Sequence, residues 1–179
     1  MKRETIGMIL GKRIFIKKQN LTTKILKWIK ATEYEEFVEL PPLASLYSVE
    51  KGYLEIYDES GKKYTFNELL QLYRDDPYLL SKYIVFRELS DRGYFLIDIS
   101  ERRNIPILLM SLDIKEKEKT KILIIEEGSK ISVDFLYNII KAIKDGGQGS
   151  TKMVIAIVER RGGVTYYTME YFLEKKNEN

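Results

Sequence analysis

Acidic side chains at the ends of two predicted strands are the first residues whose type and spacing could do chemistry. Asp98 ends one predicted strand, Glu126 or Glu127 ends a later buried strand, and Lys130 follows shortly after it. Carboxylate oxygens are the ligands that hard divalent cations prefer in proteins, and such cations assist phosphodiester cleavage. One hypothesis is therefore a metal-dependent nuclease. The same residue types also end ordinary exposed strands.

The chain of 179 residues contains no histidine and no cysteine. Histidine is the only side chain whose unperturbed pKa lies close to neutral pH, so the chain has no imidazole acid, base or metal ligand. The lack of cysteine excludes disulfides and thiolate chemistry. Residues 146–149 are glycine-rich but lack the Lys-Ser/Thr pair of a phosphate-binding loop and follow a predicted helix. No nucleophile elbow, zinc spacing or Ser-His-Asp set occurs, so we expect no cofactor and no metal outside the carboxylate hypothesis.

The overall charge is nearly balanced, with 30 basic and 27 acidic residues. Such a balance neither demands nor excludes nucleic acid as a partner. No apolar run is long enough to span a bilayer, and the first residues lack the apolar segment of a signal peptide. We therefore expect a cytoplasmic protein without a membrane partner. Many Lys, Glu and Ile residues are typical of a heat-adapted source.

The segment that organises the chain is a predicted strand–turn–strand near its end. Met153–Val158 is an unbroken apolar run, which is typical of a strand buried on both faces. Residues 159–163 interrupt the run, and their two glycines can supply the positive φ of a tight turn. Val164–Met169 is rich in Val, Thr and Tyr and predicts a second strand. Tyr171 and Phe172 keep this end apolar, so we expect it to pair or dock.

The first part of the chain predicts short strands over residues 5–28. Ile6, Met8 and Leu10 alternate with other residues, as the apolar face of a strand does. Residues 21–29 fit either a third strand or a short helix. The frequent lysines in this part predict a basic face away from the core.

Helix-start signals follow at three places. Proline stands at position 42, where it suits the first turn of a helix. Thr65 and Glu68 have the spacing of a capping box. Asp76, followed by proline, predicts the cap of a longer helix that ends at Gly93.

The second half then changes from helical to extended periodicity. Residues 94–99, 105–112 and 121–125 predict strands. Ser132 can cap a helix. The apolar face that we expect this helix to turn inward consists of Phe135, Leu136, Ile139, Ile140 and Ile143. The sequence thus predicts an α+β fold with a small amino-terminal α+β domain, residues 1–76, and a compact mixed α/β domain with a central sheet, residues 77–179.

Several of these segments resemble the archaeal tRNA-intron splicing endonucleases. Residues 83–89, followed by Asp-Arg-Gly-Tyr at 91–94, are similar to that family's helix and RGY turn. Residues 153–158 with 163–167 resemble its last strand–loop–strand. Weaker matches to its amino-terminal domain lie at residues 43–47, 52–55 and 65–70. The resemblance covers most of the chain and implies an endonuclease-like second domain.

The resemblance implies RNA cleavage at the bulge–helix–bulge of intron-containing precursor tRNA. The family uses Tyr, His and Lys without metal, and the 2′-hydroxyl attacks the adjacent phosphate to leave a 2′,3′-cyclic phosphate. Matching its motifs places the tyrosine position at Leu109 or Met110, the histidine position at Thr120, and the lysine position at Thr151, beside Lys152. The first two replacements cannot move the required protons. Lys152 fits either phosphate neutralisation or an ordinary strand edge.

A family member with an empty site implies the non-catalytic, structural subunit of a two-gene enzyme. In that form, structural and catalytic subunits assemble as an α2β2 tetramer on precursor tRNA, and a turn of one subunit docks into the other. The docking turn here is residues 159–163, and Arg160 and Arg161 make it basic where the family turn is acidic. These arginines fit either RNA phosphate or an acidic patch of the partner.

The residues expected at the two interfaces follow from the same resemblance. The expected partner contacts are Glu159, Arg160, Arg161, Gly162, Tyr167, Met169, Tyr171 and Phe172, and the expected RNA contacts are Lys152, Arg160 and Arg161. The aromatic side chains among them fit core packing equally well. Two alternatives stay open: the metal-dependent nuclease on Asp98 and Glu126, and a stand-alone RNA-binding module with salt-dependent affinity.

Overall fold

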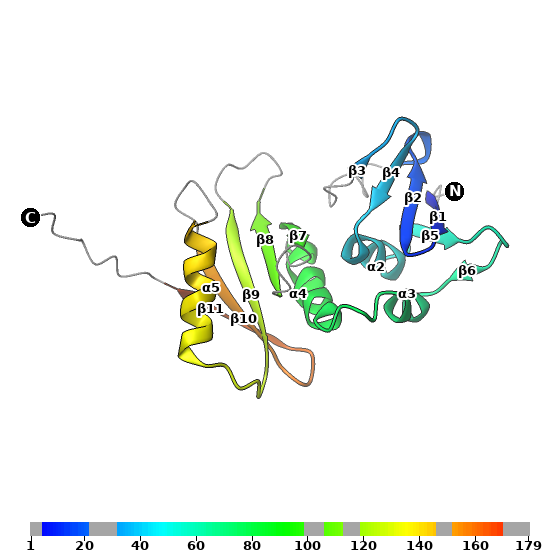
Figure 1. Cartoon of the computed structure of the whole chain (residues 1–179). Coiled ribbons are helices and arrows are strands. Elements are labelled where there is room, and N and C mark those ends of the chain that lie inside the picture. Colours follow the sequence, from blue (N-terminus) through cyan, green and yellow to red (C-terminus); the bar gives the residue numbers. More distant parts are fainter. Residues whose placement is uncertain (1–4, 22–31, 99–105, 113–118, 146–151, 170–179) are drawn as a thin grey trace, which may run out of the picture.

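The computed structural model describes residues 5–21, 32–98, 106–112, 119–145 and 152–169, which form two β-sheets with helices packed between and around them (Figure 1). The first sheet contains β1 (Thr5–Leu10), β2 (Arg13–Lys17), β3 (Thr32–Glu33), β4 (Phe37–Leu40), β5 (Leu54–Tyr57) and β6 (Lys63–Tyr64). The second contains β7 (Phe95–Asp98), β8 (Ile107–Ser111), β9 (Thr120–Glu126), β10 (Met153–Val158) and β11 (Val164–Met169). The helices are the short 3-10 helix η1 (Lys18–Asn20), α2 (Pro42–Glu50), α3 (Phe66–Leu72), α4 (Leu79–Asp91) and α5 (Val133–Asp145). The α+β class expected from the sequence is confirmed.

Both sheets are mixed. The first has the order β3-β4-β2-β1-β5-β6, in which only β1 and β5 pair in parallel. The second has the order β11-β10-β9-β8-β7, in which only β9 and β10 are parallel. A parallel pair needs a long crossover connection, and α5 lies within the connection from β9 to β10. The strands β10 and β11 pair antiparallel and form the strand–turn–strand that the sequence predicted.

Helices cover the two faces of the second sheet. Ile122 and Ala156 belong to the buried cluster that includes residues of α4, whereas Leu123 and Met153 belong to a second buried cluster with Ile139 of α5. Successive strand residues point to opposite faces, so α4 and α5 lie on opposite sides of the sheet. This arrangement buries β10 from both sides, as its unbroken apolar run predicted.

The larger buried cluster runs from the first sheet through α2 and α4 into the second sheet. Tyr47 of α2 and Phe86 of α4 meet edge to face, with ring centroids 5.8 Å apart. Leu46 and Tyr83 are almost fully buried at the same junction. The domain division at residue 76 falls between α3 and α4 and stays a prediction.

The helix ends follow the predicted caps with one correction. Thr65 and Glu68 form the capping box at the start of α3, and Gly93 adopts a φ of 98° just after α4. Asp76 was predicted to cap α4 directly, but this helix begins at Leu79. The Asp76 carboxylate instead accepts a 2.9 Å hydrogen bond from the backbone N–H of Tyr78. Aspartate readily makes such a local turn, and the turn delays the helix.

The strand indicated by the alternation of Ile6, Met8 and Leu10 is β1, but these side chains lie on its outward face and are 55%, 47% and 43% exposed. The inward face instead carries Ile9 and Gly7. A Cβ atom at Gly7 would lie 3.3 Å from the side chain of Leu54, so the missing side chain allows close packing. Alternation alone did not reveal which of the two faces is covered.

The α5 helix is capped as predicted, since the N–H of Phe135 donates a 3.1 Å hydrogen bond to Oγ of Ser132. Ile139 is buried and Leu136 partly buried, but Phe135 is 46% exposed and its predicted inward position is wrong. Phe135 lies in the first turn of α5. The other two side chains expected inward lie outside those described, as does most of the segment 21–29. No helix in the described ranges is long and apolar enough to cross a membrane.

Candidate functional site

The positions assigned to the family's reactive residues lie together at one end of the second sheet. Met110 on β8 pairs with Thr120 on β9. The N–H of the next residue, Lys121, donates a 2.9 Å hydrogen bond to the carbonyl oxygen of Lys152, just before β10. Three neighbouring strands thus bring these residues to one edge. Thr151 lies outside the described residues.

This edge carries a positive charge, but its described side chains cannot transfer protons near neutral pH. The thioether of Met110 carries no exchangeable proton, and a threonine hydroxyl such as that of Thr120 does not titrate near neutral pH. Leu109, the other residue at the tyrosine position, is also half-buried and aliphatic. Lys152 is exposed and supplies an ammonium group. The edge can therefore neutralise phosphate, but these side chains cannot act as a general acid or base near neutral pH.

The carboxylates of the metal hypothesis are held by separate partners. The ammonium group of the buried Lys82 lies 2.7 Å from the carboxylate of Asp98 and also pairs with Asp76. Glu126 accepts a hydrogen bond from the hydroxyl of Ser81. No group of three or more acidic residues suited to a metal ion occurs in the described part of the chain. The structure thus gives the metal-dependent nuclease no support.

The other carboxylate of that hypothesis helps to fix the predicted docking turn. Glu127 accepts a 2.9 Å hydrogen bond from the backbone N–H of Arg160. The turn itself is closed by the N–H of Glu159, which donates to the carbonyl oxygen of Gly163, and only Gly162 has a positive φ, 83°. The side chains of Arg160 and Arg161 are exposed. A defined turn therefore presents two guanidinium groups to solvent.

The last strand, β11, has one inward and one outward tyrosine. Tyr166 is half-buried, and its hydroxyl donates a 3.2 Å hydrogen bond to Glu88 of α4. Burial and the Glu88 charge raise the pKa of Tyr166 above its ordinary value. Tyr167 is 54% exposed, and β11 is the outermost strand of its sheet. Core packing therefore accounts for Tyr166, whereas Tyr167 is exposed among the described residues. The side chain of Met169, and Tyr171 and Phe172, lie outside the described part.

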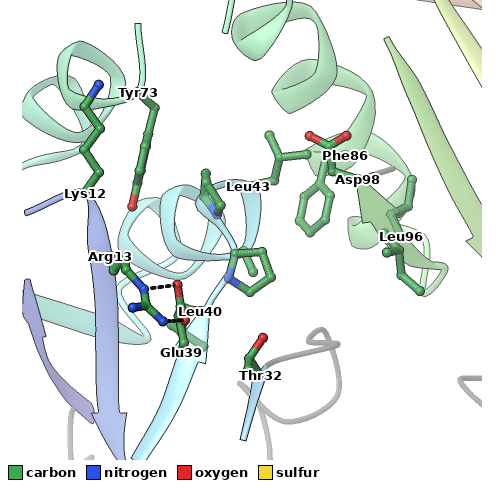
Figure 2. Close-up of a pocket in the computed structure, with 14 residues that line it drawn as sticks. Lys12, Arg13, Thr32, Glu39, Leu40, Leu43, Tyr73, Phe86, Leu96 and Asp98 are labelled. Atoms are coloured by element: carbon green, nitrogen blue, oxygen red, sulfur yellow. Dashed lines mark hydrogen bonds and ion pairs between the residues drawn. The ribbon is translucent and has the colours of Figure 1, made fainter. Parts of the chain in front are cut away.

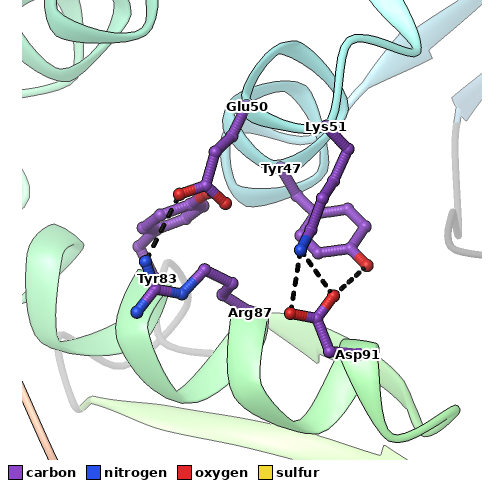
Figure 3. Close-up of polar contacts among 6 residues, drawn as sticks. All are labelled: Tyr47, Glu50, Lys51, Tyr83, Arg87 and Asp91. Carbon is purple, nitrogen blue, oxygen red and sulfur yellow. Dashed lines mark hydrogen bonds and ion pairs between the residues drawn. The ribbon is translucent and has the colours of Figure 1, made fainter.

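A charged groove of about 740 Å³ separates the docking turn from the junction of α2 and α4. Figure 3 shows the polar contacts that cross this junction. Asp91 of α4 accepts hydrogen bonds of 2.8 Å from Tyr47 and 2.9 Å from Lys51, both contributed by α2 or its end. Glu50 of α2 accepts a 2.6 Å hydrogen bond from Tyr83. These contacts hold the two helices in one fixed arrangement.

Replacing Asp91 by asparagine should remove an acid-sensitive part of this junction's stability. Partial burial raises the Asp91 pKa, but hydrogen bonds from Lys51 and Tyr47 outweigh it and hold the pKa below its ordinary value of 3.8. The lower folded pKa means that the contribution is present above about pH 4 and is lost as pH falls through the folded value. Because Asp91 is partly exposed, we expect about 0.5–1 kcal/mol at neutral pH.

Urea unfolding of the wild type and Asp91→Asn at pH 7 and pH 3 measures this effect. The wild-type advantage should shrink at pH 3, whereas Glu59→Gln, outside the junction, should show no such trend. An advantage that stays equal at both pH values would contradict the assignment.

The sequence analysis predicted neither the polar contacts between α2 and α4 nor the buried Lys82 of α4. Tyr83 and Arg87 were read only as helix residues, although both reach Glu50. Lys82 is 1% exposed, three residues after Leu79 and four before Phe86, on the apolar side of α4. A lysine at such a position was the available signal, because lysine is almost never buried without a partner.

The fold and this edge define a class: a two-sheet α+β protein whose described strand edge carries a lysine beside Met110 and Thr120, which cannot transfer protons near neutral pH. Curated relatives named "tRNA-splicing endonuclease" include those of Pyrococcus horikoshii, 30% identical over 72% of this chain and 73% of the relative, and Thermococcus gammatolerans, 28% identical over 90% and 94%. That of Methanococcus vannielii is 28% identical over 77% of each chain. No model of a protein family matches. The chain belongs to the tRNA-splicing endonuclease family, as its motifs indicated.

Proposed function

We propose that this chain is the structural, catalytically silent subunit of a heterotetrameric endonuclease that removes introns from precursor tRNA. The catalytic subunit is its protein partner in an α2β2 assembly, and the bulge–helix–bulge of precursor tRNA is the substrate. The proposed place of action is the cytoplasm. Residues 1–76 and 77–179 are proposed as its two domains.

One observation carries the proposal: the edge formed by Met110, Thr120 and Lys152 retains a cation and lacks groups for proton transfer. Metal-free RNA cleavage needs one group to accept the 2′-hydroxyl proton and another to protonate the leaving oxygen. The whole chain contains no histidine that could be brought in from elsewhere. A partner that supplies the missing acid and base is therefore required.

The carboxyl-terminal hairpin supports the assembly part of the proposal. Its outer strand, β11, is the outermost strand of the sheet in the described part of the chain, and such an edge strand readily pairs with a second chain. Tyr167 presents an exposed aromatic side chain on this strand. The proposed docking turn presents Arg160 and Arg161, which fit either acidic side chains of the partner or RNA phosphates. Lys152 is the third proposed RNA contact.

Reconstitution tests the proposal. Three samples are compared on an intron-containing precursor tRNA in EDTA: this chain, its histidine-containing partner, and their mixture. We expect no cleavage by this chain and full cleavage by the mixture, which should elute as a tetramer. The proposal is wrong if the partner alone cleaves equally well and no complex elutes, or if this chain alone cleaves without metal.

A further inference from the structure

A cavity of about 440 Å³ lies between the start of α2, the end of α3 and the strand β7 (Figure 2). Its walls combine apolar and polar groups. Phe86 and Leu96 form one side, and Lys12 and Arg13, from the β1–β2 turn and the start of β2, form the other. Tyr73 extends into the space between them (Figure 2). No residue at the edge or turn described above lines this cavity.

The hydroxyl group of Tyr73 is buried in this cavity without a hydrogen-bond partner in the described part of the chain. The residue is 8% exposed. Burial, together with the nearby negative charge of Glu39, outweighs the smaller opposite effect of the Ser45 side chain and raises the Tyr73 pKa, so the hydroxyl keeps its proton at neutral pH. A buried donor without an acceptor is unfavourable, and such groups are rare in folded proteins. Tyr73 is therefore poised to donate to something that enters the cavity.

The start of α2 adds backbone donors to the same cavity. This nine-residue helix begins after Pro41 without a side-chain cap. The N–H groups of Leu43 and Ala44 have no intrahelical acceptor, as at every helix start, and both residues line the cavity. Oriented N–H groups and the helix dipole together favour an anion at this end.

The acidic groups around the cavity are already neutralised by cations. Arg13 donates from Nε to Glu39 over 2.8 Å, and Tyr34 donates to the same carboxylate over 3.0 Å. Asp98 pairs with the buried Lys82. The ammonium group of Lys12 pairs with Asp75 at the exposed rim, where an ion pair is weak and can be exchanged. Cationic charge at the rim is thus available to an incoming anion.

We propose that this cavity binds a phosphate group, with Tyr73 and the backbone N–H groups of Leu43 and Ala44 as donors and Lys12 at the rim. A free phosphate and a backbone phosphate of RNA share the chemistry that these donors recognise. The site is separate from the proposed subunit role, because it requires no partner protein.

Calorimetric titration of the full chain with sodium phosphate, against sodium chloride of equal ionic strength, tests the site. Tyr73→Phe should weaken phosphate binding about tenfold, since a hydrogen bond to a charged group is lost. The same substitution should leave the melting temperature unchanged or raise it, because it removes an unsatisfied buried hydroxyl. Tyr94→Phe, at a half-buried tyrosine that does not line the cavity, is the control and should bind like the wild type.

Glu39→Gln gives a change of opposite sign. This substitution removes one negative charge beside the cavity and frees the Arg13 guanidinium from its ion pair. Phosphate should therefore bind severalfold more tightly. Weaker binding by Glu39→Gln, equal binding by Tyr73→Phe and the wild type, or no phosphate binding by the wild type would each overturn the proposal.

A second arm titrates a short oligouridylate. Loss of both phosphate and oligouridylate binding in Tyr73→Phe identifies a site for RNA backbone phosphate. Loss of phosphate binding alone identifies a site for free phosphate. Neither result depends on reconstituted cleavage, so failure of the subunit proposal leaves this test intact.

Discussion

Replacing Lys82 by alanine should lower the free energy of unfolding by about 3–5 kcal/mol, since it leaves the carboxylates of Asp76 and Asp98 without their buried cation. Lys82 is 1% exposed, so water cannot replace the lost charge easily. Guanidinium unfolding at pH 7 measures the loss. The site links the start of α4 to β7, and we expect the whole second sheet to be affected.

A double variant separates charge from packing at this position, and a variant of an exposed ion pair serves as the control. In Lys82→Met/Asp98→Asn, the methionine retains most of the apolar stem and the asparagine removes one charge, so much of the loss should be recovered. Lys12→Ala breaks the exposed pair with Asp75 and should cost only about 0–1 kcal/mol. A loss below 1 kcal/mol in Lys82→Ala would show that the buried pair does not stabilise the fold as described.

Replacing Tyr167 by aspartate should weaken assembly with the catalytic subunit at least about 30-fold, while the isolated chain stays folded. An exposed tyrosine on the outermost strand of a sheet has the properties of an interface hot spot, and losing one costs about 2 kcal/mol or more. Burying the introduced carboxylate in the interface adds to this loss. Analytical ultracentrifugation of the mixture measures the change, and cleavage should fall with it.

The matched control is Tyr137→Asp, because Tyr137 is 63% exposed on α5, on the face of the second sheet opposite α4. This variant should assemble like the wild type. Equal assembly by Tyr167→Asp and the wild type would remove β11 from the proposed interface. A parallel loss in both variants would indicate a general effect of the added charge.

Local signals predicted the parts of the fold that depend on a few neighbouring residues. The capping box at Thr65 and Glu68, the Ser132 cap and the end of α4 before Gly93 all follow from backbone groups that need a partner within one turn. The β10–β11 hairpin followed from an apolar run and a glycine turn. These features need no information about distant parts of the chain.

Local signals did not predict which face of a strand is buried or which distant residues contact each other. Whether Ile6, Met8 and Leu10 of β1 face solvent or the core depends on which side of the sheet the helices cover. The alternation of residues along the strand is the same in both cases. Lys82 finds Asp98 sixteen residues later only because α4 packs against β7. The buried Tyr73 hydroxyl, which has no hydrogen-bond partner among the described residues, likewise becomes apparent only when α2 and β2 pack near the end of α3.

The amino-acid sequence was enough to establish that the chain has no imidazole group and to indicate the family it resembles, with Met110 and Thr120 at the positions where that resemblance places proton-transfer groups. Only the packing of distant segments showed that these positions share one edge with Lys152, that Asp98 forms an ion pair with Lys82, and that Tyr73 lines a cavity beside the start of α2. The physical reason is that composition limits the available reactions without reference to shape. Distance, burial and partner choice arise only when separate segments pack together.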